Sequence, residues 1–177
     1  HLEWMTDVIA HRAAERSGAS FYAVIQPEGM KEHFPSTTLD CTHSAVLADF
    51  LEHVDIVITV HGFGRRGLFG SLLLGGQNRV FAEHVGATLR RHIPAYNVIT
   101  DIEDIPRQLR GMHERNPVNV PRQQGVQIEL PPRIRGASSP LWWDWEGPNL
   151  TPHTERLIDG LSQAAMTWEP EPLNRPF

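Results

Sequence analysis

Short apolar runs alternate with segments of helical periodicity along this chain of 177 residues, and this alternation restricts its fold more than any other feature. The pattern predicts helices over residues 4–16, 44–53, 78–92 and 151–166, and strands over residues 20–25, 56–61, 71–76, 95–100 and 125–130. We expect an α/β fold: a single three-layer domain with a mixed, mostly parallel sheet and helices on both faces. The domain is predicted to cover residues 1–168, followed by an extended, proline-rich tail over residues 169–177.

Composition and charge exclude several classes of protein. The formal net charge of −5 argues against a non-specific nucleic-acid binder. The single cysteine, Cys41, excludes an internal disulfide framework and a cysteine-based zinc finger. No apolar run approaches the roughly 18 residues that a membrane span needs. We therefore expect a soluble monomer that binds neither nucleic acid nor membrane, and that is either cytoplasmic or released from the cell.

Two predicted strands carry polar residues that could take part in chemistry. The run DIVITVHG ends in His61, and the run GVQIEL contains Glu129. In open α/β sheets, ligands bind beyond the carboxyl ends of the strands, which favours both residues. Strand alternation places Gln127 and Glu129 on one face, where a buried carboxylate needs a partner or a function. The alternative is an edge strand with Glu129 in solvent.

Two further groups of residues could complete a site. Asn119 and Arg122 precede the last predicted strand, and an arginine can grip a substrate carboxylate through two parallel hydrogen bonds. The alternative is a surface arginine and a turn asparagine. At the start of the chain, His1 and Glu3 are residue types that bind zinc, and three protein ligands plus water define a catalytic zinc site. His61 could then reach the same ion, with Glu129 as general base.

The order of these motifs resembles the poly-γ-glutamate hydrolase family, phage and bacterial proteins similar to zinc carboxypeptidases. The resemblance runs from about Glu3 to Gly136 through LEWMTDVIA, VDIVITVHG, LLLGGQN and LRGMHERNPVNVPRQQGVQIELPPRIRG, the last being the most specific. It implies a compact zinc carboxypeptidase-like α/β fold that binds one zinc ion. The family's HGGxxE-type stretch matches here at Glu3, and His1 occupies a variable position of it. The ligand histidine is thus expected before residue 1, together with the N-terminal part of the domain; in the alternative, His1 takes over its role.

The resemblance also assigns roles to residues. It implies that Glu3 and His61 bind the metal, that Glu129 is the general base, and that Asn119 and Arg122 grip a carboxylate-bearing substrate. Arg65 or Arg66, beside the metal-binding strand, could replace Arg122. The implied activity is zinc-dependent hydrolysis of γ-glutamyl or related amide bonds in an anionic peptide or poly-γ-glutamate-like substrate. The alternatives are a zinc amidase or carboxypeptidase for a small acylated amino acid or ordinary peptide, and a metal-free binding domain without catalysis.

Overall fold

The computed structural model describes residues 3–27, 29, 35–39, 41–136 and 150–169. Its α-helices are α1 (Thr6–Ser17), α2 (Ala45–His53), α3 (Arg79–His92) and α4 (Pro152–Met166), and its strands are β1 (Val57–Gly62), β2 (Ser71–Gly75), β3 (Asn97–Ile99) and β4 (Gly125–Leu130). Short 3-10 helices lie between them: η1 (Ser36–Thr38), η2 (Cys41–His43), η3 (Ile102–Asp104), η4 (Arg107–Leu109) and η5 (Pro117–Asn119).

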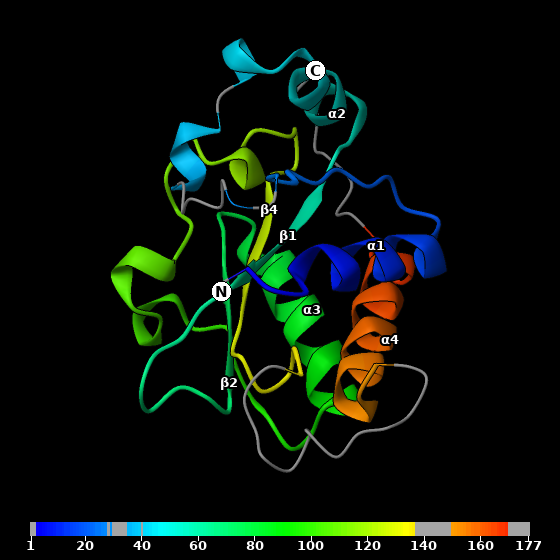
Figure 1. Ribbon diagram of the computed structural model, residues 1–177, viewed down its shortest axis with the longest axis vertical. Helices are drawn as coiled ribbons and strands as arrows, with labels where there is room; N and C mark the ends of the chain where they lie inside the picture. Colours follow the sequence, from blue (N-terminus) through cyan, green and yellow to red (C-terminus); the bar gives the residue numbers. More distant parts are fainter. Residues whose placement is uncertain (1–2, 28, 30–34, 40, 137–149, 170–177) are drawn as a thin grey trace, which may run out of the picture.

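The strands form one mixed, mostly parallel sheet in the order β1-β4-β2-β3 (Figure 1). Strand β1 runs parallel to β4, and β2 runs parallel to β3, whereas β2 and β4 are antiparallel. Strand β4 therefore has a hydrogen-bonded neighbour on each side, and all six of its residues are buried. The expected mixed, mostly parallel sheet is confirmed.

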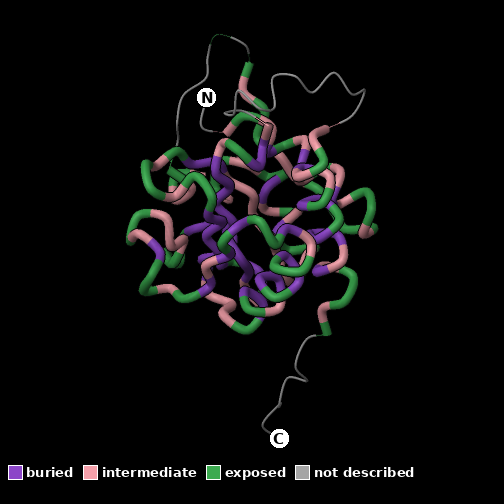
Figure 2. The backbone as a smooth tube through the Cα atoms, turned by 90° about the horizontal axis from the view of Figure 1, so that it is seen from below, coloured by how far each residue is buried: buried purple, intermediate pink, exposed green. Residues whose placement is uncertain are grey.

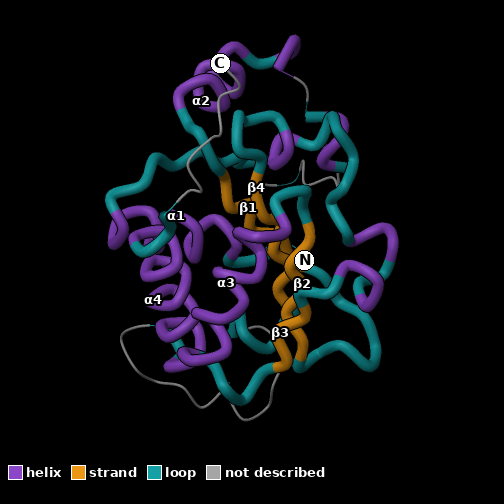
Figure 3. Tube along the Cα trace, turned by 180° about the vertical axis from the view of Figure 1, so that it is seen from behind, coloured by secondary structure: helices purple, strands orange, loops and turns teal. Residues whose placement is uncertain are grey.

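The main core lies between one face of the sheet and helices α1, α3 and α4, which lie together on that side (Figure 3). Every second residue of β4, namely Val126, Ile128 and Leu130, belongs to this core. The opposite face carries a smaller apolar cluster of Phe63, Leu73 and Ile105, with Ile102 of η3 and Leu109 of η4 packed against it. This second layer is thus built from 3-10 helices and loops. Figure 2 shows the buried segments gathered in the interior.

Local sequence explains where the longer helices begin. Side-chain oxygens of Ser44, Asn78 and Thr151 accept hydrogen bonds from the backbone N–H groups that the first turns of α2, α3 and α4 leave free. Pro152 occupies the first turn of α4, where its missing N–H costs nothing. Helix α1 ends at Gly18, which adopts the left-handed conformation typical of a helix end.

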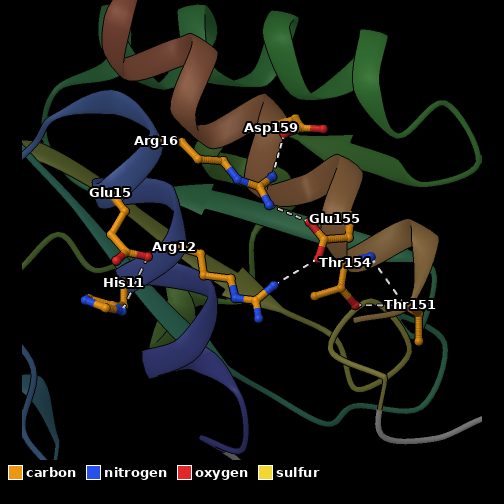
Figure 4. Close-up of polar contacts among 8 residues, drawn as sticks. All are labelled: His11, Arg12, Glu15, Arg16, Thr151, Thr154, Glu155 and Asp159. Atoms are coloured by element: carbon orange, nitrogen blue, oxygen red, sulfur yellow. Dashed lines mark hydrogen bonds and ion pairs between the residues drawn. The ribbon is translucent and has the colours of Figure 1, made fainter. Parts of the chain in front are cut away.

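Ion pairs join α1 to α4 across the surface of the helical layer (Figure 4). The Glu155 carboxylate accepts hydrogen bonds from Arg12 at 3.0 Å and from Arg16 at 2.6 Å. Arg16 also pairs with Asp159 at 2.6 Å. Such partly exposed pairs contribute little individually, so they fix the orientation of α1 more than they stabilise the fold. That orientation matters because the residues before α1 enter the candidate site.

One predicted strand is wrong. Residues 20–25 are extended but pair with no strand, and Val24 and Ile25 are 51% and 68% exposed. An extended apolar run becomes a strand only where a neighbour accepts its backbone hydrogen bonds. The rings of Phe21 and Tyr22 in this run instead contact His11 of α1 and Phe50 of α2. His1 and the tail residues 170–177 lie outside the described residues. Within the described part of the chain, no helix is long and apolar enough to span a membrane.

Candidate active site

His61 and Glu129 lie side by side near the carboxyl ends of two adjacent parallel strands. Their Cα atoms are register partners in the pairing of β1 with β4. Strand alternation directs both side chains away from the α-helices and toward the second face. There they border a cavity of about 310 Å³, which is lined by Glu3, Pro35, Ser36, His61, Gly62, Phe63, Gly64, Arg65, Gln108, Leu109 and Glu129. The structure thus brings His61 and Glu129 together, as the strand-end rule predicts.

Glu3 joins them from the segment that precedes α1. Its backbone carbonyl accepts hydrogen bonds from the Thr6 N–H at 3.3 Å and the Thr6 hydroxyl at 2.9 Å. The buried guanidinium of Arg135 donates to the carbonyl of the next residue, Trp4, at 2.7 Å. These contacts hold the Glu3 backbone against the sheet, so that its carboxylate reaches the end of β1.

The Glu3 carboxylate bridges the last two residues of β1. Its Oε2 accepts a hydrogen bond from the Gly62 N–H at 2.9 Å, and its Oε1 lies 3.7 Å from His61 Nδ1. Gly62 itself remains in the strand, and the Phe63 N–H still donates to the Leu130 carbonyl at 3.1 Å. The N–H of Gly62 points away from β4 and donates to the Glu3 carboxylate instead.

Glu129 lies in an environment unusual for a carboxylate. It is 5% exposed and belongs to a central strand, so the alternative of an edge strand with Glu129 in solvent is wrong. Burial raises the pKa of Glu129, and the charge of Glu3 raises it further. His61, the hydrogen bond from Gln127 and the charge of Arg135 oppose this shift but do not cancel it. A carboxylate with a raised pKa is a better proton acceptor, as general-base catalysis requires.

His61 and Glu3 shift each other's proton affinity in opposite directions. Burial alone would lower the pKa of His61, but the close contact with Glu3 and the charges of Glu129 and Glu3 outweigh it, so the pKa is raised. Burial alone would raise the pKa of Glu3, but His61, the Gly62 N–H and Arg135 together lower it. Glu3 therefore stays ionised more readily than an ordinary glutamate, and the imidazole of His61 binds a proton more readily than an ordinary histidine.

Glu3 and His61 offer an oxygen and a nitrogen donor of the types that zinc prefers. Among the described residues, no group of three histidine, cysteine, aspartate or glutamate side chains is arranged to hold a metal ion. The described part of the chain thus brings together two side chains of the types that bind zinc, fewer than the three protein ligands that a catalytic zinc site needs. His1, considered as a third ligand, lies outside it. The donor set that is present fits zinc, and a further ligand has to complete it.

Asn119 and Arg122 are not brought to this cavity. Arg122 pairs with Asp55 at 2.9 Å, at the amino ends of β1 and β4. From Gly125 to Glu129 alone, a strand covers about 13 Å at roughly 3.3 Å per residue. The buried Asn119 side chain is fully engaged: its oxygen accepts from the Gln77 N–H, and its amide group donates to the carbonyls of Gly111 and His113. Asn119 and Arg122 therefore make contacts within the fold and do not line the cavity.

Arg65 is the cation that borders the cavity. Within the described residues, its guanidinium makes no hydrogen bond or ion pair, whereas Arg122 is paired. Arg66 is exposed and does not line the cavity. Sequence reasoning gave no role to Gln127, Asn116 and Arg135, which are buried around Glu129. The sequence did indicate Gln127, because strand alternation places it on the same face of the strand as Glu129.

Two comparisons with known proteins found a match. The family model for poly-γ-glutamate hydrolase matches residues 1–138. Among solved structures, the chain is similar to a bacteriophage poly-γ-glutamate hydrolase, with a TM-score of 0.71 and 20% identity over 92% of this chain and 76% of the other. This likeness confirms the expected fold. No curated protein sequence matches. Since the family model covers well over half of the chain, this protein belongs to the poly-γ-glutamate hydrolase family.

Proposed function

We propose that this protein is a zinc-dependent amidohydrolase that cleaves γ-glutamyl amide bonds in an anionic, poly-γ-glutamate-like substrate. The observation that carries the proposal is the convergence of Glu3, His61 and Glu129, from three separate segments, on one cavity. Membership of a hydrolase family and likeness to a phage enzyme of that name support the reaction class.

In this proposal, Glu3 and His61 hold the metal, and Glu129 moves the proton. When bound, zinc would polarise the scissile carbonyl and acidify the attacking water. Glu129 takes a proton from that water as the new C–O bond forms, and it delivers the proton to the nitrogen as the C–N bond breaks. The products are a carboxylate and an amine. The burial of Glu129 keeps bulk water away from this transfer.

Arg65 is proposed as the group that binds a substrate carboxylate. Its guanidinium is partly exposed, lines the same cavity as Glu129 and has no partner among the described residues. A glutamyl substrate carries a carboxylate beside each scissile amide, and an arginine can accept it through two parallel hydrogen bonds. This role replaces the one first expected for Arg122.

One observation favours the second candidate, an amidase or carboxypeptidase for a small acylated amino acid or ordinary peptide. A larger cavity of about 480 Å³ lies between α1, α2 and β1, and it shares Glu3, Ser36 and His61 with the first. Apolar side chains such as Leu47, Leu51 and Phe81 line it, and these would suit an acyl chain or apolar residue. A metal-free binding domain is the third candidate, and measured zinc content distinguishes it.

The proposal is tested by incubating the zinc-loaded full-length protein with poly-γ-glutamate and an α-linked polyglutamate. We expect new amino groups to appear from the γ-linked polymer and to depend on zinc. Preferential cleavage of N-acyl amino acids or α-linked peptides would support the second candidate instead. If no amide is cleaved although zinc is bound, the proposed activity is wrong.

A further inference from the structure

Glu129 is the end of a buried chain of hydrogen-bonded side chains. Asn116 Nδ2 donates to Gln127 Oε1 at 2.7 Å, and Gln127 Nε2 donates to Glu129 Oε1 at 2.9 Å. Asn116, Gln127 and Glu129 are 3%, 5% and 5% exposed, so water does not compete for these bonds. The reaction proposed above assigns no role to the two neutral amides, Asn116 and Gln127, that are hydrogen-bonded in series to this buried carboxylate.

The direction of every bond in this chain is set by one backbone group. The Val118 N–H donates to Asn116 Oδ1 at 3.2 Å, and a backbone N–H can only donate. Asn116 must therefore turn its amino group toward Gln127. Gln127 accepts this hydrogen bond with its side-chain oxygen, so its own amino group faces Glu129. Glu129 Oε1 is thus the end of a one-way chain and acts as an acceptor.

We propose that Gln127 and Asn116 are positioning residues that hold Glu129 Oε1 as a fixed hydrogen-bond acceptor and leave Glu129 Oε2 to exchange the proton with the substrate. The inference rests on the proposed function, because it concerns the general base of that reaction. It assigns the two carboxylate oxygens different tasks. It also gives a role to two polar residues whose burial would otherwise be costly.

The loop above Gln127 closes the space around the amide. Gly111 has a φ of 62°, and a Cβ built on it would lie 2.6 Å from Gln127 Oε1. The Gly111 carbonyl accepts a hydrogen bond from Asn119 Nδ2 at 2.8 Å, which ties this loop to η5. Asn119, first expected to bind substrate, therefore supports the positioning of Gln127 from a distance. The amide has little freedom to rotate once this loop is in place.

Fixing the base matters because proton transfer needs a short, aligned contact. A misplacement of about 1 Å can cost about 100-fold in rate. A glutamate side chain has three rotatable bonds, and the bond from Gln127 restricts the last of them. Removing that bond should therefore lower kcat by about 10- to 100-fold while KM changes little, since neither amide touches the cavity that holds the substrate.

Two variants break the chain in different ways. Gln127→Leu removes both of its bonds at similar volume. Asn116→Asp keeps the acceptor for the Val118 N–H but replaces the donor with an oxygen, so that Gln127 should turn its amide and present its oxygen to Glu129. The second variant is nearly isosteric and tests the direction of the chain if the first does not fold. Gln163→Leu on α4 is the matched control, since Gln163 is half-buried and borders neither cavity.

The experiment measures kcat, KM and zinc content for each variant, alone and combined with Glu129→Gln. We expect Gln127→Leu and Asn116→Asp to lower kcat with KM within about twofold, and to have no further effect once Glu129 is replaced. Equal losses with and without Glu129, or unchanged kcat in both variants, would overturn the positioning role alone. A zinc-loaded parent protein that cleaves no amide would instead overturn the proposed function and this inference with it.

Discussion

His61 and Glu129 are register partners on adjacent parallel strands, each one residue before the end of its strand. The sheet therefore sets their spacing independently of any ligand. A substitution at one should leave the backbone at the other in place, so that metal binding and proton transfer can be separated by mutation.

We expect His61→Ala to abolish zinc binding while the fold survives. His61 is only partly buried, and the role proposed for it is that of a metal ligand, so its removal should cost little stability in the metal-free protein. The checks are elemental analysis and circular dichroism, with His53→Ala on exposed α2 as the control. Unchanged zinc occupancy would remove His61 from the metal site.

Glu129→Gln should keep zinc and lose turnover by at least about 100-fold, the usual contribution of a general base. The substitution preserves the shape of the side chain and leaves Glu3 and His61, the proposed metal ligands, in place. The measurement is kcat at saturating substrate together with zinc content, beside Glu114→Gln, which changes an exposed carboxylate. Rates within a few-fold of the parent would show that another group carries the proton.

Zinc affinity should fall as the pH is lowered. The pKa of His61 is raised above its ordinary value of 6.5, so the imidazole is protonated over more of the neutral range and must release that proton to bind metal. The apparent Kd should therefore rise toward about tenfold per pH unit as the pH falls below the raised pKa. Glu129→Gln removes one charge that raises this pKa, which should move the dependence to lower pH. An affinity that is constant from pH 8 to pH 6 contradicts the assignment.

Arg65 and Arg122 should differ in their effect on substrate binding. Arg65→Gln removes the cation that lines the cavity and should lower kcat/KM by about 10-fold or more. Arg122→Gln breaks only the exposed pair with Asp55 and should leave kcat/KM unchanged. Steady-state kinetics on an anionic substrate measure both. The reverse result would return Arg122 to the substrate site.

Asn119→Ala should destabilise the protein by about 2–4 kcal/mol, because a buried side chain that makes three hydrogen bonds is removed and its backbone partners lose their contacts. Chemical denaturation measures the loss. Asn97→Ala, at an exposed position of β3, provides the control and should change stability much less. If the two variants were equally stable, Asn119 would not have the structural role described.

The sequence predicted the parts of this structure that depend on local pattern. The apolar periodicity located the α-helices that the structure describes and the strands that contain His61 and Glu129, because burial on one face imposes that pattern. It failed for residues 20–25, since pairing depends on a neighbour that the local sequence does not reveal. Arg122 was misplaced for a related reason. It is close to Glu129 in sequence, but a fully extended strand separates the two.

The central claim is that Glu3 and His61 hold a zinc ion beside a general base that cleaves γ-glutamyl bonds. The most direct measurement is zinc content and poly-γ-glutamate hydrolysis by the full-length protein, before and after chelation. We predict about one zinc per chain, hydrolysis that chelation abolishes and that zinc restores, and loss of the metal in His61→Ala. Hydrolysis that persists at full rate without metal would contradict the account, as would a protein that takes up no zinc.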